Sequence, residues 1–465
     1  MRNARFAIVA VLVVLPIAAL AGPDDLPTTK SEQGQDGLHS FERRQDQGEP
    51  LTLQRAVNEA LDKNPTLITL RKQFEASRHR PAQEQSLMAP SFEAQIWQWP
   101  INTLDPLKVN MYMFTVHQDL PGFGKRQLRA NLAEKESQVA ESQIAVSART
   151  VINDVKRSYA EIFLARKEAD LRVRNIDLLR QFADVSEAKY ATGRISQQDV
   201  LKAVVEISRM HDDIFMLDER LQVAEAQLNA LLDRPVNAPI GPLAEPHESV
   251  SLPSVSELQQ IALDRHPELQ MARLERERSD AALAVAKKEY RPDFFVGGGY
   301  MLSPQERDSW TASVGITWPR APWARKGLDA RVAEATADTE TAVAKQREVE
   351  SSIRLAVQQA YVRVIVANQR AELLRGSVLP QSEQTLEVSR VAYQTDRGDF
   401  LAMIDSQRVL LDTQLTYYRA LGDSEQALAD LERAIGTEIE PLIKSNGSVS
   451  NDNNTKVTDA GGVSQ

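Results

Sequence analysis

The sequence predicts a mixed, mainly α-helical fold made of two similar halves, each with a pair of β-strands. Three observations lead to this prediction: an internal duplication, four long helical stretches, and one switch in each half to alternating apolar and polar residues. Charged residues make up 26% of the chain and aromatic residues only 6%. That balance suits long solvated helices better than a bulky globular core.

The duplication is visible as short motifs that recur at a nearly constant spacing. The motif Ala-Leu-Asp-Lys-Asn-Pro ends at Pro65, and Ala-Leu-Asp-Arg-His-Pro ends at Pro267, an offset of 202 residues (267 − 65). Tyr190 and Tyr393 match at an offset of 203 (393 − 190). So steady an offset indicates one structural unit present twice. Two copies are too few for an open solenoid, so the pair must close on itself or on other subunits.

The composition along the chain divides it into five segments. We expect a signal peptide over 1–21, a flexible segment over 22–50, a first repeat over 51–245, a second repeat over 246–438 and a disordered tail over 439–465. The first segment has a basic start, an apolar core and a final Ala-Leu-Ala, which is typical of a cleaved export signal. We therefore expect the chain to be exported, to a bacterial periplasm or beyond. The flexible segment and the tail are poor in bulky apolar residues.

Each repeat should contain a long helical hairpin, over about 122–234 in the first and about 324–436 in the second. Residues 125–192 contain no glycine or proline, and as one helix they would span on the order of 100 Å. Helices of this length indicate a coiled-coil or barrel architecture. We place the hairpin turns at 190–193 and 393–396. The first ends in glycine, which tolerates positive φ, whereas the second ends in aspartate, which tolerates it less well.

Strands are expected over about 91–118 and 293–318, because apolar and polar residues alternate there. In residues 310–318 one face is Trp, Ala, Val, Ile and Trp, and the other is Thr, Ser, Gly and Thr. The same alternation runs through 111–118. The pattern fits strands of a membrane barrel, with one face in lipid. It fits a soluble hairpin with one buried face as well, and both interpretations stay open on the strand pattern alone.

The order of these elements resembles the TolC-like outer-membrane efflux protein family over residues 50–438. The two helix-opening motifs resemble those of the family, as does Gln-Asp-Leu-Pro-Gly-Phe-Gly-Lys-Arg over 118–126 at the junction between strand and long helix. Leu-Asn-Ala-Leu-Leu over 228–232 resembles the return of the first hairpin. No single motif is diagnostic, but their order at duplicate spacing is. The Pro-Gly-Phe-Gly-Lys part is similar to members that serve heavy-metal pumps, although other members have it too.

The resemblance implies a homotrimer. Its four strands per chain would complete a twelve-strand β-barrel in contact with outer-membrane lipid, and its hairpins a trimeric α-barrel extending into the periplasm. Four strands cannot close a barrel and two hairpins cannot close a tube, whereas three copies of each can. The implied function is the exit duct of a tripartite efflux system, with a periplasmic adaptor protein and an inner-membrane pump as partners. The alternative is a soluble periplasmic coiled-coil scaffold without a pore.

The resemblance also implies a gate at the periplasmic end of the helices. The gate candidates are Tyr393, Asp396, Asp399 and Asp405. The residues expected to contact an adaptor at the hairpin tips are Tyr190, Gly193, Arg194 and Arg397. Gly398 and Ala402 stand where some members carry an arginine and a second aspartate, so the identity of the acids that line the gate stays open. Alternatively, the three aspartates only solvate a helix turn.

The sequence contains no pattern that indicates an enzyme, a cofactor or a resident metal ion. It has no Gly-rich phosphate loop or HExxH motif, and its six histidines are scattered. The absence of cysteine excludes disulfides and a Cys-linked lipid anchor. A net charge of −10 argues against a nucleic-acid partner. Met111, Met113 and His117 share one strand face and offer ligands to soft cations, with packing or lumen lining as the favoured alternative. The transported substrate stays open.

Overall fold

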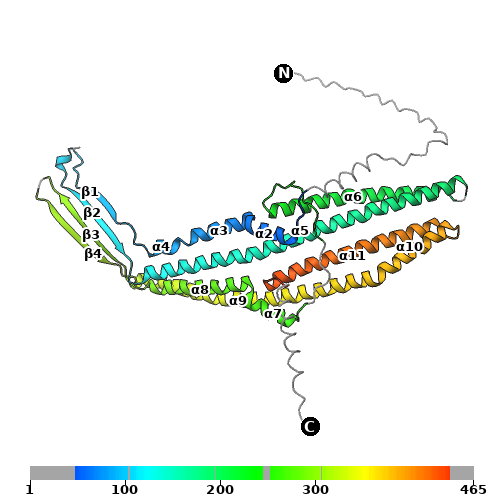
Figure 1. Ribbon diagram of the computed structural model, residues 1–465. Helices are drawn as coiled ribbons and strands as arrows, with labels where there is room; N and C mark the ends of the chain where they lie inside the picture. Colours follow the sequence, from blue (N-terminus) through cyan, green and yellow to red (C-terminus); the bar gives the residue numbers. More distant parts are fainter. Residues whose placement is uncertain (1–47, 103–104, 194, 245–251, 305, 440–465) are drawn as a thin grey trace, which may run out of the picture.

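The structure, a computed structural model, is an elongated molecule with a β-sheet at one end and the tips of two helical hairpins at the other (Figure 1). It describes residues 48–102, 105–193, 195–244, 252–304 and 306–439. The expected signal peptide, the flexible segment up to residue 47 and the tail from residue 440 lie outside the described residues. Leu51, just after the expected flexible segment, pairs with Leu243 through an isolated bridge.

The same order of elements occurs twice along the chain. The first repeat consists of α2 (Leu53–Lys63), α3 (Pro65–Ser77), α4 (Arg80–Gln85), β1 (Ser91–Trp97), a 3₁₀ turn (Pro106–Lys108), β2 (Met111–Leu120), α5 (Lys125–Ala191) and α6 (Gln197–Leu231). The second consists of α7 (Val255–Arg265), α8 (Pro267–Lys288), β3 (Phe294–Leu302), β4 (Ser309–Ile316), α9 (Pro322–Leu373), a π-helical turn (Leu374–Val378), α10 (Leu379–Gln394) and α11 (Phe400–Ile435). The mainly helical prediction with two strands per half is confirmed.

The duplicated Asn-Pro and His-Pro motifs form equivalent joints between short helices. The side chain of Asn64 accepts hydrogen bonds from the backbone N–H groups of Thr66 and Leu67. In the second repeat, Nδ1 of His266 accepts from the N–H of Glu268. In both joints the next residue is proline, which suits the first helical position because it has no N–H to satisfy. The motif recurs because it starts a helix in the same way in each repeat.

The two long hairpins differ in one respect that the sequence prediction missed. In the first hairpin α5 runs for 67 residues without interruption. In the second, the π-helical turn separates α9 from α10, and Pro380 sits in the first turn of α10. Proline has no N–H and its ring crowds the preceding turn, so a regular helix cannot pass through it unchanged. The π turn is the local adjustment to that residue.

The four strands form one antiparallel sheet in the order β1-β2-β3-β4, so β1 and β4 are its edges. The register places Thr115 opposite Gly299, and even-numbered residues of all four strands share one face. That face is apolar and open: Phe92, Trp310 and Val314 are 78%, 82% and 81% exposed. The odd-numbered face carries mainly Ser, Thr, Gln, Gly and Met. The predicted alternation is therefore confirmed, and its apolar face is uncovered in the single chain.

Three apolar clusters hold the helices together. The first lies where α2, α5 and α6 meet, the second between the two hairpins, and the third where α7, α9 and α11 meet. Their most deeply buried members include Ile162, Leu221 and Leu228; Ile176, Phe400 and Met403; and Leu258, Val357 and Leu431. Because the second cluster draws on both repeats, the two halves form one body.

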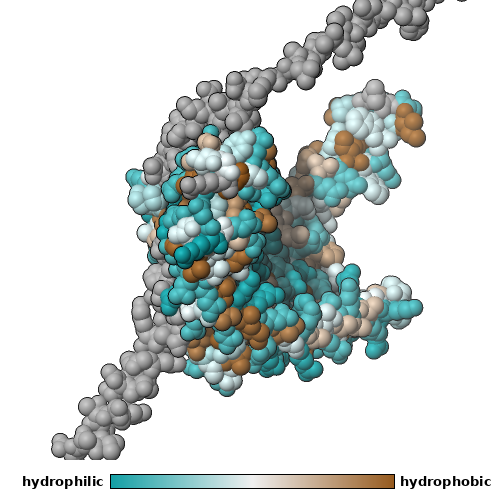
Figure 2. Space-filling view, turned by 90° about the vertical axis from the view of Figure 1, so that its right-hand side faces the viewer, coloured by the Kyte–Doolittle hydropathy of each residue, from teal (hydrophilic) through white to brown (hydrophobic). Residues whose placement is uncertain are grey.

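The molecule is curved across its long axis. Seen from the end with the hairpin tips, its surface surrounds a hollow with predominantly hydrophilic walls, open on one side (Figure 2). None of the described helices has both the length and the apolar character needed to cross a membrane.

Candidate functional site

The tips of the two hairpins meet around a buried tyrosine. Tyr393, near the end of α10, is only 3% exposed, and its hydroxyl lies 3.0 Å from the Ser186 hydroxyl on α5. Its ring packs against that of Phe400, with centroids 5.5 Å apart. The hydroxyl contact therefore joins the two hairpins, and the aromatic contact packs α10 against α11 within the second hairpin.

A lysine from the first repeat completes this contact. Lys189 Nζ lies 4.2 Å from the centroid of the Tyr393 ring. It donates to the Tyr393 carbonyl oxygen at 2.5 Å and to Asp396 Oδ1 at 2.7 Å. A cation over an aromatic face and beside the last carbonyls of a helix is stabilised by both. We call Ser186, Lys189, Tyr393 and Asp396 the tip cluster.

Two residues of the tip cluster were missed by the sequence analysis. Ser186 and Lys189 lie within one turn of Tyr190, which was singled out, but a serine and a lysine on a long solvated helix are ordinary. The distinguishing signal is tertiary, because it depends on the two tips lying side by side. One clue was available: Lys189 and Asp396 have opposite charge and flank the matched tyrosines of the two repeats.

The predicted hairpin turns are placed correctly, and both need a left-handed residue. Gly193 has φ of 71° and Asp396 has φ of 55°. Aspartate is one of the few non-glycine residues that tolerate this region. The N–H groups of Arg397 and Gly398 both donate to the Ala392 carbonyl, at 2.9 and 3.0 Å, and so close the second turn.

The remaining predicted site residues are spread around the tips. Tyr190, Gly193 and Arg397 are exposed at the ends of the hairpins, and Arg194 lies outside the described residues. Asp399 immediately precedes α11 and makes no capping bond with its side chain. Asp405 is exposed on α11, with its charge beside Arg408. The structure thus brings Tyr393 and Asp396 together and places Asp399 and Asp405 on the surface.

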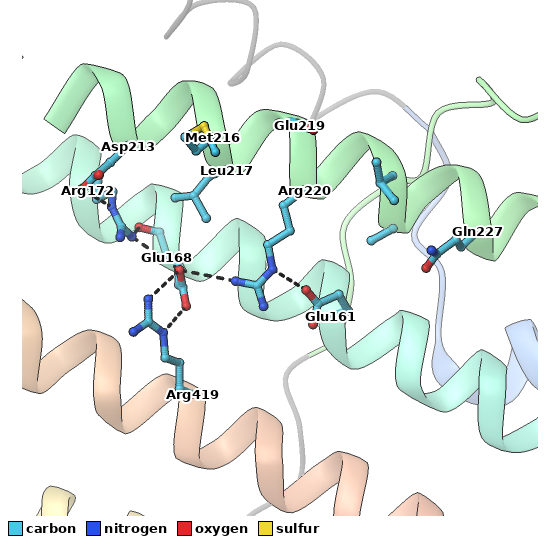
Figure 3. Close-up of a pocket in the computed structure, with 12 residues that line it drawn as sticks. Glu161, Glu168, Arg172, Asp213, Met216, Leu217, Glu219, Arg220, Gln227 and Arg419 are labelled. Atoms are coloured by element: carbon cyan, nitrogen blue, oxygen red, sulfur yellow. Dashed lines mark hydrogen bonds and ion pairs between the residues drawn. The ribbon is translucent and has the colours of Figure 1, made fainter. Parts of the chain in front are cut away.

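Further from the tips, the hairpins are joined through a buried carboxylate. Glu168 on α5 is 1% exposed and accepts from Arg419 Nε of α11 at 2.7 Å. Arg172 of α5 and Arg220 of α6 approach it at 3.6 and 3.8 Å, so cations from three helices converge on one acid (Figure 3). The bond to Glu168 raises the pKa of Arg419 above its usual value.

These residues line a groove of about 610 Å³ that also contains Glu161 and Asp213. Arg220 bonds to Glu161, and Arg172 bonds to Asp213 at 3.2 Å. Glu161, Glu168 and Asp213 in the groove are therefore already paired with its arginines. The groove is a joint between hairpins rather than a preformed ligand site.

A second charged cluster ties the repeats together at the other end of α5. Lys125, the first residue of α5, is 2% exposed and its Nζ lies 2.9 Å from Asp293 Oδ2 and 3.2 Å from Glu289 Oε2. Arg129 donates to Glu289 Oε1 at 2.8 Å. We call these four residues the junction cluster. It lies where the helices join the sheet.

Burial and pairing act in opposite directions on the two junction acids. Desolvation alone would raise the pKa of Glu289, but its bonds to Arg129 and Lys125 prevail and lower it. Desolvation would likewise raise the pKa of Asp293, and the N–H of Gly122 at 2.7 Å together with Lys125 lowers it. The cluster is thus built to hold both carboxylates ionised.

The structure explains why the residues Pro-Gly-Phe-Gly-Lys occur at 121–125. A Cβ on Gly122 would lie 2.3 Å from the Pro292 carbonyl oxygen, so no larger residue fits there. Gly124 has φ of 81°, a left-handed conformation that glycine adopts without strain. Lys125 supplies the cation. In the stretch from Pro121 to Lys125 the backbones of the two repeats therefore pack closely together, and the ion pairs of Lys125 stabilise the contact.

Comparison with known proteins identifies the family. The sequence model described as "Outer membrane efflux protein" matches residues 56–234 and 258–437. The chain belongs to the outer membrane efflux protein family. This confirms the TolC-like resemblance and makes the chain a member of a family of efflux channels rather than enzymes. Among the described residues, no group of three His, Asp or Glu side chains is placed to hold a metal ion.

Relatives of this efflux protein have varied names. It is 23% identical over 392 residues to the cobalt-zinc-cadmium resistance protein CzcC of Cupriavidus metallidurans, covering 83% of this chain and 90% of that protein. It is 20% identical to nodulation protein T of Rhizobium leguminosarum bv. trifolii, covering 69% and 70% of the two chains. Among solved structures, the outer-membrane channel OprN has a TM-score of 0.71 at 18% identity, covering 84% of this chain and 91% of its own. These likenesses place the efflux protein in a TolC-like fold.

Proposed function

We propose that this chain is the outer-membrane exit channel of a tripartite efflux system, acting as a homotrimer with a periplasmic adaptor and an inner-membrane pump. The observation that carries the proposal is the two-faced sheet. An apolar face this exposed is rare on a soluble protein. Opposite it, the other face is small and mostly polar, as the lumen side of a membrane barrel is.

The need to close the four-stranded sheet into a barrel supports the trimer. With β1 and β4 as edges, the four-stranded sheet leaves two rows of backbone groups that a neighbouring copy can pair. Three chains would contribute twelve strands, enough to close a barrel around a lumen. The hairpins carry exposed apolar residues as well, including Phe215 on α6 and Val366 on α9. In a closed ring such residues would pack between adjacent chains.

The tip cluster supports a gate at the far end of the channel. Lys189, Ser186 and Tyr393 hold the second hairpin against the first, which would keep the tips drawn together. Tyr190, Gly193 and Arg397 are exposed where an adaptor would reach them, and Arg194 directly follows Gly193 in the sequence. Repeated three times about an axis, Asp405 and Asp399 would form rings of negative charge that favour cations.

We further propose metal cations as the cargo. Support comes from the relative CzcC, whose name specifies cobalt, zinc and cadmium resistance. It also comes from the exposed acids Asp399 and Asp405 near the hairpin tips.

The proposal is tested by the state of the purified protein. Light scattering in detergent should give a particle of three chains, each of 51.9 kDa before export processing, and planar bilayers should show discrete conductance steps. A monodisperse monomer that is soluble without detergent and forms no pores would instead support the periplasmic scaffold.

A matched pair of substitutions tests the membrane placement of the sheet. Val314→Arg puts a charge on the apolar face and should cost about 2–4 kcal/mol if that face lies in lipid. Ser313→Arg, one residue earlier on the same strand, should be tolerated in the lumen. The measurement is the yield of heat-modifiable assembled trimer for each variant. Equal yields would contradict the barrel.

A further inference from the structure

Three methionines gather at one place on the polar face of the sheet. Met113 on β2 and Met301 on β3 are direct partners in the antiparallel register. Met111 lies two residues from Met113 on the same strand and therefore on the same face. Directly opposed side chains have Cβ atoms about 4.5–5.5 Å apart, and diagonal neighbours about 7–8 Å apart. Three long, flexible side chains at these spacings can bring their sulfur atoms together.

These methionines are not an extension of the apolar face. The residues beside the Met113–Met301 pair are Gln95 on β1 and Ser309 on β4. The next row towards the helices contains Glu93, Thr115, Gly299 and Thr311. All three methionines are partly exposed. The chain has nine methionines and no cysteine, so one third of its sulfur atoms lie in this patch.

We propose that Met111, Met113 and Met301 form a binding site for a soft monovalent cation, Cu(I) or Ag(I), on the lumen face of the sheet. This inference rests on the proposed channel, and it specifies the metal cargo as a soft monovalent cation rather than the cobalt, zinc and cadmium in the name of CzcC. Thioether sulfur is a soft ligand that selects such ions over hard or borderline divalent cations. Three neutral thioether donors can bind a singly charged ion without any of them having to ionise, and Glu93 of β1, a diagonal neighbour of Met113 on the same face, adds a negative charge nearby.

Thioether ligation also suits a site that cargo must leave. Thiolate and imidazole ligands must lose a proton before they bind a metal, which makes their affinity depend on pH. A thioether has no proton to lose, so the site should bind equally well from acidic to neutral pH. His117, on the same face, is four residues from Met113 along β2, about 13 Å at 3.3 Å per residue. It is too distant to share the ion, so its titration should not affect the site.

The test is Ag(I) binding to the purified full-length chain, measured by competition titration and by the methyl NMR signals of methionine. We expect one tight site per chain, with shifts confined to the signals of Met111, Met113 and Met301. Met113→Leu combined with Met301→Leu should weaken binding by at least about 10- to 100-fold, the loss caused by removing even an outer-shell partner of a metal site. Methionine and leucine have similar volume, so the sheet should be retained.

Two controls sharpen the result. The matched variant carries Met88→Leu and Met216→Leu, which remove two exposed methionines elsewhere and should leave binding unchanged. His117→Ala should also leave it unchanged, at pH 5 as at pH 7. The alternative is a packing role, since Trp97 lies opposite Met111 and sulfur packs well on aromatic rings. In that case Ag(I) would bind the patch variant as tightly as the parent.

Equal affinity of the parent and patch variants for Ag(I), or Zn(II) bound by the patch as tightly as Ag(I), would overturn the assignment. Conductance in planar bilayers separates this outcome from failure of the proposed function. A conducting trimer without Ag(I) binding refutes only the thioether site. A protein that forms no pore refutes the channel, whatever the titration shows.

Discussion

Helix α5 carries a lysine near each end, and both lysines bind the second repeat, but in different surroundings. Lys125 is 2% exposed and touches two carboxylates. Lys189 is 14% exposed, and its one carboxylate, Asp396, is 54% exposed. Water can replace an exposed partner at little cost, whereas a buried charge that loses its partner is strongly destabilising. The comparison indicates that the sheet end of the molecule is fixed and that the tip end can come apart.

The largest expected effect is at the junction. Lys125→Met should destabilise the protein by about 3 kcal/mol, the lower end of the range for breaking a buried pair, because Glu289 and Asp293 keep some access to water. The neighbouring Arg126 donates to the exposed Gln85 carbonyl and pairs with no carboxylate among the described residues, so Arg126→Met should stay within about 0.5 kcal/mol. Denaturant unfolding followed by far-UV circular dichroism measures both. Similar losses for the two variants would mean that the junction is not specially anchored.

The junction should also respond to acid. Both acids have pKa values below their ordinary 4.5 and 3.8 in the folded protein. Their contribution to stability is therefore complete above those ordinary values and is lost as pH falls through the lowered ones. The stability difference between the parent and Glu289→Gln should be constant near neutral pH and shrink on acidification below about 4.5. Glu84→Gln, on exposed α4 and away from the junction cluster, is the matched control variant.

At the tip the stability effect should be small and the functional effect large. Lys189→Met should change the free energy of unfolding by less than about 1 kcal/mol, as expected for a partly exposed pair. The same change removes the contacts to Tyr393 and Asp396, so single-channel conductance should rise. Lys202→Met provides the control, because Lys202 is near the tip but pairs at 4.0 Å with Asp199 of its own helix. Unchanged conductance in the Lys189 variant would show that the contacts of the tip cluster do not hold the channel closed.

The smallest effect is expected from the exposed acid on α11. Asp405→Ala should lower cation selectivity and block by multivalent cations, because it removes one ring of charge from a narrow opening. Asp412→Ala lies two turns further along the same exposed face and should have less influence. Bilayer recordings in varied salt are the measurement, since charges are screened beyond about 10 Å at 0.1 M. If the two variants behave alike, Asp405 only solvates its helix.

Local patterns predicted most of the fold. Alternation in residues 310–318 located β4 because one face of a strand must be apolar if it is to meet lipid or a core. The matched prolines Pro65 and Pro267 located the helix joints because proline suits only a few backbone positions. Asp396 was placed at the second turn as a residue that tolerates positive φ less well than glycine, and it does adopt a positive φ there.

The features that could not be predicted from the sequence depend on contacts between segments that are distant along the chain. Lys189 resembles any solvated lysine until α10 is seen beside it. The junction motif was recognised as a motif, but its partners Glu289 and Asp293 lie more than 160 residues away, and nothing local identifies them. The interruption before α10 does have a local signal, because Pro380 cannot continue a regular helix unchanged.

The π-helical turn before α10 sets the direction in which each side chain of α10 points around the helix axis. A helix advances by about 100° per residue, since one turn takes 3.6 residues. The π-helical turn at Leu374–Val378 therefore fixes which side of α10 faces α5 and which faces outward. Removing one residue there would swing Tyr393 roughly a quarter turn away from Ser186 without altering any residue at the tip. The contact between the two hairpin tips thus depends on the five residues of the π-helical turn, which lie far from the tips in the sequence.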